Sequence, residues 1–170
     1  MGLEKEIHFL ISSHSSIAVT PHFDGEHSSI IYTNLGSLKS KGTTDEIIRQ
    51  YCLNFGASLE GRQMASRKLL SITKTPPILI SERLGIVGME LPTYNTLGKT
   101  WVFDLSFTIE ECGAYSLLIF NNGVTIKVAL KEAAVRYRRE KALHLLYTKV
   151  PLHDLNLINF KLHSDKYFTY

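Results

Sequence analysis

The pair Pro76–Pro77 divides the middle of the chain into a helical part and an extended part. Proline lacks an amide hydrogen and fixes its φ angle, so two in succession end any helix that precedes them. Helical patterns lie before the pair, and strand patterns follow it. The order of expected elements along the chain is therefore strands, helices, strands and a final helix.

The segment Thr43–Ser71 predicts two short helices with a tight connection. Thr43 and Glu46 have the spacing of a capping box, and apolar residues follow at helical spacing. Gly56 is a typical helix stop. Ser58 can cap a second helix that begins at Leu59 and runs to about Ser71.

Strand patterns occupy most of the remaining chain. Period-two alternation is clearest from Trp101 to Glu110, which predicts one long half-buried strand. The pair Asn122–Gly123 predicts a hairpin turn between strands at Ser116–Phe120 and Val124–Leu130, with a basic helix from about Lys131 to Tyr147 after it. The other expected strands are Ile7–Ile11, Ser16–Thr20, Ser28–Thr33, Ile78–Ile80 and Ile86–Leu91, and residues 34–44 and 91–100 are expected to be loops.

These elements predict an α+β fold with a largely antiparallel sheet, two short central helices and a C-terminal basic helix. A chain of 170 residues suits one domain, which we expect over residues 1–150. Residues 151–170 form an aromatic tail, and so many exposed aromatics would be unusual on a monomer. We therefore expect the tail to be a dimer or partner element; its aromatic residues are Phe160, Tyr167, Phe168 and Tyr170.

Positive charge is concentrated in two windows, although the net charge is only +3. The window Arg49–Lys74 has five basic residues and one acid, and the window Lys127–Lys149 has seven basic residues and two acids. The rest of the chain has seven basic residues and thirteen acids. Such segregation is typical of a face that binds a polyanion.

Three interpretations of the windows remain open: a nucleic-acid surface, a surface for an acidic protein, and two ordinary solvated helices. Arginine favours the first, because its guanidinium suits phosphate and narrow minor grooves. The candidate DNA-binding residues are Arg49, Arg62, Arg67, Lys68, Lys74, Arg136, Arg138, Arg139 and Lys141.

Catalytic, metal and cofactor chemistry has little support in the sequence. His22, Asp24 and His27 flank an Asp-Gly turn and are weak candidates for a metal site. The segment Gly98–Trp101 resembles the end of a phosphate-binding loop, but a strand pattern follows it instead of a helix. We expect a protein that is not an enzyme and that needs no metal and no cofactor.

The expected location is the cytoplasm. Cys52 and Cys112 are far apart and have no metal-ligand spacing, so they are interpreted as free thiols in a reducing compartment. No run of 18 apolar residues is present to span a membrane.

An ordered set of segments resembles the competence transcription factor (ComK) family of Gram-positive bacteria. The similarity covers about Ser16 to Leu145. Its segments are IAVTPHFDGEHSSII at residues 17–31, CLNFGASLEGRQ at 52–63, ITKTPPILI at 72–80, LPT at 91–93, Trp101, and FNNG at 120–123.

The resemblance implies a DNA-binding transcription activator of DNA-uptake genes, located at the nucleoid. Family members bind paired A/T-rich boxes from the minor-groove side, as dimers that pair up, and bend the DNA. Arg62, Arg67 and Lys68 would then meet phosphates or enter the groove, while Gly56 and Gly61 would let the backbone approach DNA closely. The alternative for the glycines is a helix cap and helix packing.

Two features depart from the family pattern. Thr75 stands where the family tends to have a basic residue before the double proline, with Lys74 one position earlier. The best-known member also has a C-terminal motif that a proteolytic adaptor reads, and the tail of this chain has no equivalent. An adaptor therefore stays an open partner. The other alternative is a non-catalytic interaction module of the same fold whose basic face meets an acidic protein.

Overall fold

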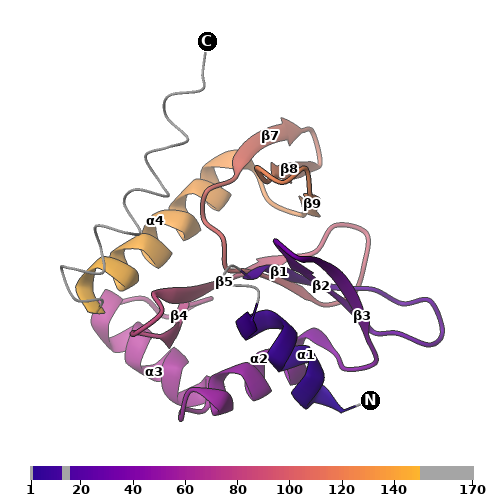
Figure 1. Ribbon diagram of the computed structural model, residues 1–170. Helices are drawn as coiled ribbons and strands as arrows, with labels where there is room; N and C mark the ends of the chain where they lie inside the picture. Colours follow the sequence, from indigo (N-terminus) through magenta and orange to yellow (C-terminus); the bar gives the residue numbers. More distant parts are fainter. Residues whose placement is uncertain (1, 13–15, 150–170) are drawn as a thin grey trace.

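The computed structural model describes residues 2–12 and 16–149, which form four helices and two antiparallel sheets (Figure 1). The helices are α1 (Leu3–Ser12), α2 (Thr44–Asn54), α3 (Leu59–Leu70) and α4 (Glu132–Lys149). The six-stranded sheet has the order β3-β2-β1-β6-β5-β4, with β1 at Ser16–Pro21, β2 at Ser29–Thr33, β3 at Gly36–Ser40, β4 at Ile78–Ser81, β5 at Ile86–Pro92 and β6 at Lys99–Val102. The second sheet is β7 (Thr108–Cys112), β8 (Tyr115–Ile119) and β9 (Thr125–Val128). The predicted α+β class is confirmed.

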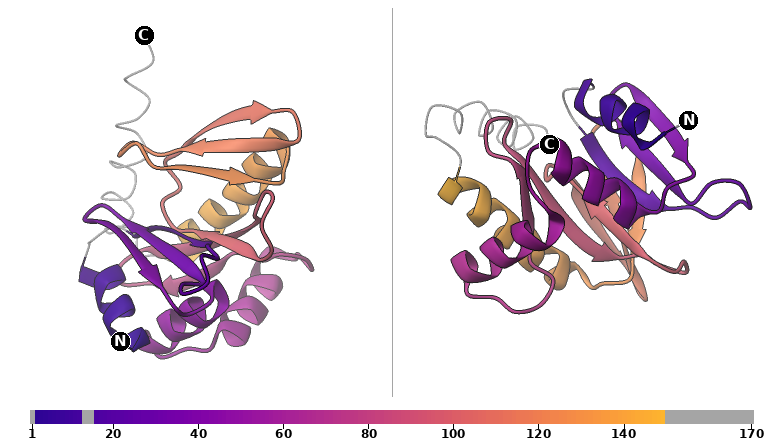
Figure 2. Two further views of the ribbon diagram at one scale, coloured as in Figure 1. Left: turned by 90° about the vertical axis from the view of Figure 1, so that its right-hand side faces the viewer. Right: turned by 90° about the horizontal axis from the view of Figure 1, so that it is seen from below.

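The six-stranded sheet lies between two layers (Figures 1 and 2). Helices α1, α2 and α3 lie along one face, and α4 and the three-stranded sheet lie along the other. Each face has its own apolar core. The first contains Tyr51 and Trp101, and the second contains Met89 and Leu118. Strand β4 supplies both cores alternately, since Ile78 and Ile80 face the first and Leu79 faces the second.

The two sheets are joined by backbone hydrogen bonds. Thr93, just after β5, forms an isolated antiparallel bridge with Val128 of β9. The Ala129 amide also donates to the Pro92 carbonyl at 2.9 Å. These bonds bring the start of α4, which follows β9, close to the end of β5. This junction therefore helps to fix where α4 lies on the large sheet.

The predicted helix ends are confirmed around α2 and α3. Thr43 and Glu46 form the full capping box, with the Thr43 amide donating to the Glu46 carboxylate at 2.7 Å. Gly56 follows the last turn of α2 with φ at +72°, a conformation that glycine adopts without a Cβ penalty. Ser58 caps α3 by accepting from the Gly61 amide at 3.0 Å.

We predict that Thr43→Ala lowers the free energy of unfolding by about 1 kcal/mol at neutral pH, because the first turn of α2 loses its cap. The Thr43 amide, which alanine keeps, and then the Thr43 hydroxyl, which alanine removes, hold the pKa of Glu46 below its usual value of 4.5. A lowered native pKa stabilises the fold above the unfolded-state pKa, and this contribution disappears as pH falls through the native pKa. The variant lacks the part of this contribution that comes from the hydroxyl bond. The difference in free energy of unfolding between the wild type and the variant should therefore become smaller in acid. Urea unfolding at several pH values measures it, with Thr96→Ala in an exposed loop as the control.

The expected strand at Ile7–Ile11 is wrong, because these residues belong to helix α1. Ile7 and Leu10 are buried and Leu3 packs partly against the same core, which is helical spacing. A short apolar run has no clear period of its own, so the sequence pattern did not distinguish helix from strand.

The expected loop at residues 34–44 is also wrong in part, because it contains β3. This strand pairs with β2 along its whole length, from Gly36 opposite Thr33 to Ser40 opposite Ser29. It is an edge strand whose side chains are mostly exposed and polar, so it lacks apolar alternation.

The single long strand expected from Trp101 to Glu110 is two strands in different sheets. Strand β6 ends at Val102, and β7 begins at Thr108. Between them the Asp104 carboxylate accepts a hydrogen bond from the Ser106 amide at 2.9 Å, which is a local turn. Phe103, Leu105 and Phe107 are all buried, so the alternation that suggested one strand comes from a connection that packs between layers.

The expected hairpin around Asn122–Gly123 is confirmed as β8 and β9, with Gly123 at φ +88°. The basic helix is confirmed as α4. The aromatic tail at residues 151–170 lies outside the described residues.

Candidate nucleic-acid interface

The loop at residues 71–77 connects α3 to β4. Helix α3 ends at Leu70, which is buried, and Ser71 caps it in a left-handed conformation with φ at +52°. The Arg67 side chain reaches over this end, and its Nε donates to the Thr73 carbonyl at 3.1 Å. Pro76 and Pro77 are buried at the far end of the loop. The loop is therefore fixed to the helix at one end and to the sheet at the other.

Helix α4 lies along the same side of the molecule. Its buried residues are Val135, Ala142, Leu145 and Leu146, which pack in the second core. The Glu132 amide at its first turn donates to the Glu111 carboxylate at 2.8 Å. This bond also holds the pKa of Glu111 below its usual range. Core packing and this bond fix which residues of α4 face the 71–77 loop.

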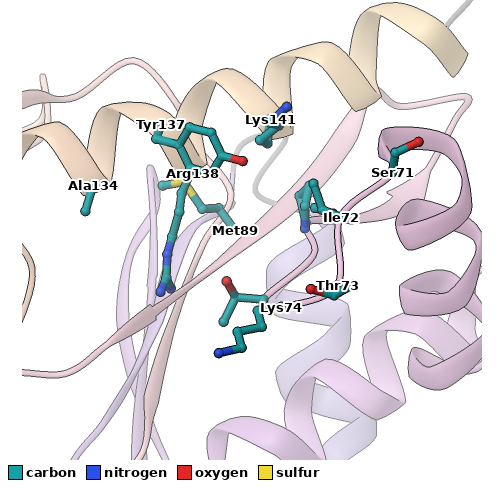
Figure 3. A pocket seen from close by; sticks show the side chains of 11 residues that line it. Ser71, Ile72, Thr73, Lys74, Met89, Ala134, Tyr137, Arg138 and Lys141 are labelled. Atoms are coloured by element: carbon teal, nitrogen blue, oxygen red, sulfur yellow. The ribbon is translucent and has the colours of Figure 1, made fainter.

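A pocket of about 530 Å³ lies between the loop and α4 (Figure 3). Lys74 lines it from the loop, and Tyr137, Arg138 and Lys141 line it from α4. The two basic windows are more than 50 residues apart in the chain, yet they meet here. The remaining lining residues are Ser71, Ile72, Thr73, Thr75, Pro77, Met89 and Ala134. We call this set the loop–α4 pocket.

Arg138 holds α4 against the edge of the large sheet. Its Nη1 donates to the Glu90 carbonyl at 2.7 Å. Strand β4 pairs with β5 only from Ile78, opposite Gly88, so Glu90 lies beyond the paired part of β4. Pro76 and Pro77 have no amide hydrogen that could extend the ladder before Ile78, and the guanidinium of Arg138 binds the Glu90 carbonyl instead. Burial lowers the pKa of Arg138.

Arg139 has a similar role beside the three-stranded sheet. Its Nη1 donates to the Phe107 carbonyl at 2.8 Å, and its guanidinium lies 4.9 Å from the centre of the Phe107 ring. Burial, followed by the nearby charge of Arg136, lowers its pKa. Arg138 and Arg139 thus both fix α4 through backbone carbonyls.

Three other candidate arginines have acidic neighbours. Arg49 pairs with Glu60, and Arg136 pairs with Glu132 one turn earlier on α4. Arg62 is only 22% exposed, with Glu82 at 4.0 Å. Its Nη2 also lies 3.5 Å from the Ile80 carbonyl. Part of the positive charge expected at these positions is therefore compensated within the chain.

Three candidate lysines are without such compensation. Lys68, Lys74 and Lys141 form no ion pair with any residue of the described ranges 2–12 and 16–149. Lys68 and Lys74 are exposed on α3 and on the loop. Lys141 lies on α4 with its Nζ 5.3 Å from the centre of the Tyr137 ring. These lysines, together with Arg67, which bonds only the Thr73 carbonyl, carry positive charge that no acidic side chain of the described residues compensates.

The glycines of α3 and its approach have local reasons. Gly56 ends α2, as described above. A Cβ at Gly61 would lie 3.0 Å from Ser58 Oγ, the atom that caps the helix, so a side chain there would crowd the cap. Helix capping alone accounts for both positions.

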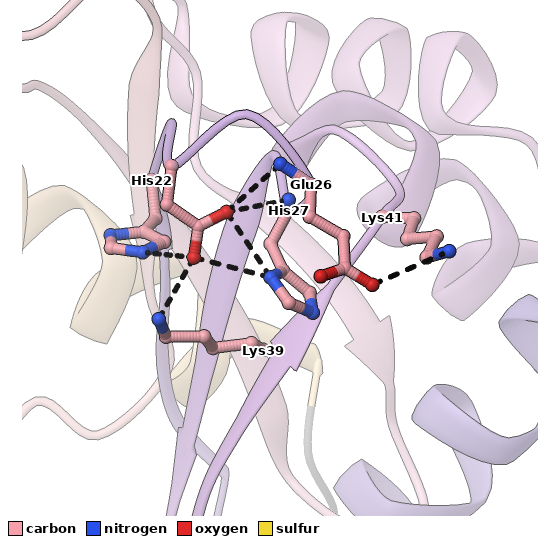
Figure 4. Close-up of polar contacts among 6 residues, drawn as sticks. His22, Glu26, His27, Lys39 and Lys41 are labelled. Carbon is pink, nitrogen blue, oxygen red and sulfur yellow. Dashed lines mark hydrogen bonds and ion pairs between the residues drawn. The ribbon is translucent and has the colours of Figure 1, made fainter.

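The hairpin tip between β1 and β2 is a network around Asp24 (Figure 4). Its carboxylate accepts from Lys39 Nζ and from the His27 amide, each at 2.8 Å, and a ring nitrogen of His22 lies 3.2 Å away. The bond from Lys39, followed by the backbone bonds, holds the pKa of Asp24 far below its usual range. Over the described residues, no group of three or more His, Cys, Asp or Glu side chains is arranged to hold a metal ion.

The comparison with protein families adds an independent observation. The sequence matches the model of the family described as "ComK protein" over residues 7–150, which is most of the chain. The chain belongs to the ComK family. This is a family of competence transcription factors, so the resemblance suggested by the sequence motifs is confirmed. Searches of curated proteins and of solved structures give no significant match.

The ComK family match includes both basic windows and the whole loop–α4 pocket. In the described part of the chain, no helix is both long and apolar enough to cross a membrane. A transcription factor of this family needs a surface for nucleic acid, and the surface around the pocket has the uncompensated lysines. Met89 was not identified from the sequence, because only the packing of α4 on β5 brings it close to Lys74 and Lys141. Ser71, Thr73 and Thr75 are close to Lys74 in the chain, but the sequence did not show that they line a pocket.

Proposed function

We propose that the chain is a sequence-selective DNA-binding activator of competence genes that acts in the cytoplasm, at the nucleoid. It binds A/T-rich duplex DNA with the surface formed by α3, the 71–77 loop and α4. The observation that carries the proposal is the convergence of both basic windows on one pocket in a chain of the ComK family.

The proposed contacts divide the nine candidate cations into three groups. Lys68, Lys74 and Lys141 meet DNA directly, because no acidic side chain of the described residues neutralises them. Arg138 and Arg139 act by positioning α4 through the Glu90 and Phe107 carbonyls. The remaining four lie around this surface and exchange acidic or carbonyl partners for phosphate; they are Arg49, Arg62, Arg67 and Arg136.

A preference for A/T-rich boxes follows from minor-groove shape. A-tracts have a narrow minor groove with a deeper negative potential, which favours inserted cations. The proposed recognition therefore depends on groove width more than on base-specific hydrogen bonds. We propose two boxes per site, each met by one half of a symmetric protein.

The test is a gel-shift titration with duplexes that carry paired A-tract and T-tract boxes, against a G·C-rich duplex of equal length. We expect tighter binding to the A/T-rich duplex at about 150 mM salt. We also expect log K to fall linearly with log salt concentration, as phosphate contacts release counterions. Equal affinity for both duplexes would contradict groove recognition. Absence of DNA binding, together with binding to an acidic protein, would favour the interaction-module alternative.

We also propose that the protein is a homodimer, or pairs into a dimer of dimers on DNA. The tail at residues 151–170 has four aromatic residues and is the proposed dimer element. Truncation after Lys149 should convert the dimer to a monomer in sedimentation equilibrium, while the circular dichroism spectrum keeps its helical and strand features. A truncated chain that still sediments as a dimer would remove the tail from the interface.

A further inference from the structure

We infer that the loop–α4 pocket is a phosphate-binding site, in which Lys74 and Lys141 hold one phosphate group from opposite walls. The group is a phosphodiester of DNA or the phosphate of a free nucleotide. The inference rests on the proposed function only where the phosphate comes from DNA.

Charge is the first argument. Three cations line the pocket, namely Lys74, Arg138 and Lys141, and none of the described lining residues is acidic. The carboxyl end of α3 opposes them with about half an elementary negative charge. That end already has Arg67, which bonds the Thr73 carbonyl. The cations therefore outweigh the helix dipole, and the pocket favours an anion.

The lysines are also free to move onto a ligand. Each has an ammonium on a flexible four-carbon chain, so its donors can turn without backbone movement. Lys74 is exposed, and neither Lys74 nor Lys141 forms an ion pair with another described residue. Arg138 stays on the Glu90 carbonyl and adds fixed positive charge beside them. Figure 3 shows Lys74 on the loop side and Lys141 on the α4 side.

Shape is the second argument. A volume of about 530 Å³ exceeds a single phosphate and suits a nucleotide-sized group. The apolar lining contains Met89, which is buried, and Pro77. Tyr137 is 55% exposed and presents an aromatic face at the edge, where a base or sugar can pack. Hydroxyls of Thr73 and Thr75 supply further donors around the anion.

The backbone of the loop is the third argument. Ser71 has φ at +52° and Thr75 has φ at +44°, and only one other non-glycine residue in the described chain, Asn95, has a positive φ. Thr75 is β-branched and precedes a proline, so this conformation is costly for it. Strained backbone of this kind is typical of ligand clamps held in place by the surrounding fold. The buried prolines and the Arg67 bond supply that restraint here.

The direct test uses the full-length protein in solution. Amide NMR signals are followed while inorganic phosphate or adenosine monophosphate is added at constant ionic strength, with sodium chloride as the reference. We expect shifts confined to residues 71–77 and to the face of α4 around Tyr137 and Lys141. In the double variant Lys74→Gln and Lys141→Gln the apparent affinity should fall about tenfold or more, as expected for lost charge-assisted bonds. The double variant Lys5→Gln and Lys41→Gln removes two exposed lysines on α1 and just after β3, outside the pocket lining, and is the matched control.

The source of the phosphate is separated by a second measurement. An A/T-rich duplex is prepared with one neutral methylphosphonate at a time along each strand. If the pocket takes a DNA phosphate, one position will weaken wild-type binding about tenfold but leave the double variant unaffected, because the variant has already lost that contact. If it takes a free nucleotide, adenosine monophosphate will bind tighter than inorganic phosphate, and the methylphosphonate scan will affect both proteins alike.

Each outcome decides the inference independently of DNA binding. Pocket-specific shifts that the double variant loses support it, even when no duplex binds. Uniform or absent shifts with phosphate and nucleotide overturn it if the protein binds no duplex, or if the wild type and the double variant bind duplex DNA with identical methylphosphonate scans. If the protein binds A/T-rich duplexes but the wild type and the double variant give identical scans, the proposed function stands and the phosphate site in the pocket is rejected.

Discussion

Replacing Arg138 by methionine should lower the free energy of unfolding by about 2 kcal/mol. The guanidinium donates to the Glu90 carbonyl at 2.7 Å, beyond the last position at which β4 pairs with β5. Methionine keeps much of the apolar length of the side chain, so the main loss is the charge-assisted bond and the unpaired carbonyl left behind. Urea denaturation followed by circular dichroism measures the change.

Arg136→Met is the matched control, because it lies two positions earlier on the same helix. Its partner Glu132 is one turn away and the pair is exposed, so its loss should change stability by no more than about 0.5 kcal/mol. Equal losses for the two variants would show that the Glu90 bond contributes nothing special. Arg138 is proposed to position α4 and not to contact DNA. The DNA affinity of the folded Arg138→Met protein should therefore fall only if α4 shifts.

Arg136 and Arg138 differ in a way that the sequence around them does not show. Both stand in the segment VRYRREK, and charge alone gave them one role. Their partners are 48 residues apart in one case and four in the other. A local sequence pattern can show a partner four residues away, but not one 48 residues away. The structure was needed to separate an anchoring arginine from a surface arginine.

Local chemistry did predict the elements with strong end signals. The Thr43–Glu46 capping box, the Ser58 cap and the Asn122–Gly123 turn all form as expected. Where tertiary packing decided the outcome, the pattern failed. Helix α1 is stabilised by the core it covers, and the chain from Trp101 to Glu110 crosses from one sheet to another.

The candidate site shows the same division. The two basic windows were visible as composition, but their meeting point depends on where α4 crosses β5 and the 71–77 loop. The one sequence signal that could have located it is Thr75 before Pro76–Pro77. The ComK family tends to have a basic residue at this position, and here it is a threonine. Its positive φ became visible only with the backbone.

The triple variant Lys68→Gln, Lys74→Gln and Lys141→Gln should bind A/T-rich duplex DNA about 10²-fold more weakly at roughly 150 mM salt. Each lost phosphate contact reduces the slope of log K against log salt by about 0.9, so three contacts reduce it by about 2.7. Folding should survive, because Lys68 and Lys74 are exposed, and Lys141, whose ammonium lies 5.3 Å from the centre of the Tyr137 ring, forms no ion pair with a described residue. Fluorescence anisotropy titrations at four salt concentrations give both numbers.

A second triple variant controls for net charge. It combines Lys5→Gln, Lys39→Gln and Lys41→Gln, and so removes the same number of positive charges from α1 and from the region of β3. Strands β3 and β4 are the two opposite edges of the large sheet. Lys39 and Lys41 pair there with Asp24 and Glu26, so they lie on a surface that already has compensated charge. We expect its slope to stay close to that of the wild type, because long-range attraction is screened beyond about 10 Å. Equal slopes for the two triple variants would mean that net charge alone drives binding, and the DNA surface would then not be centred on α3 and α4.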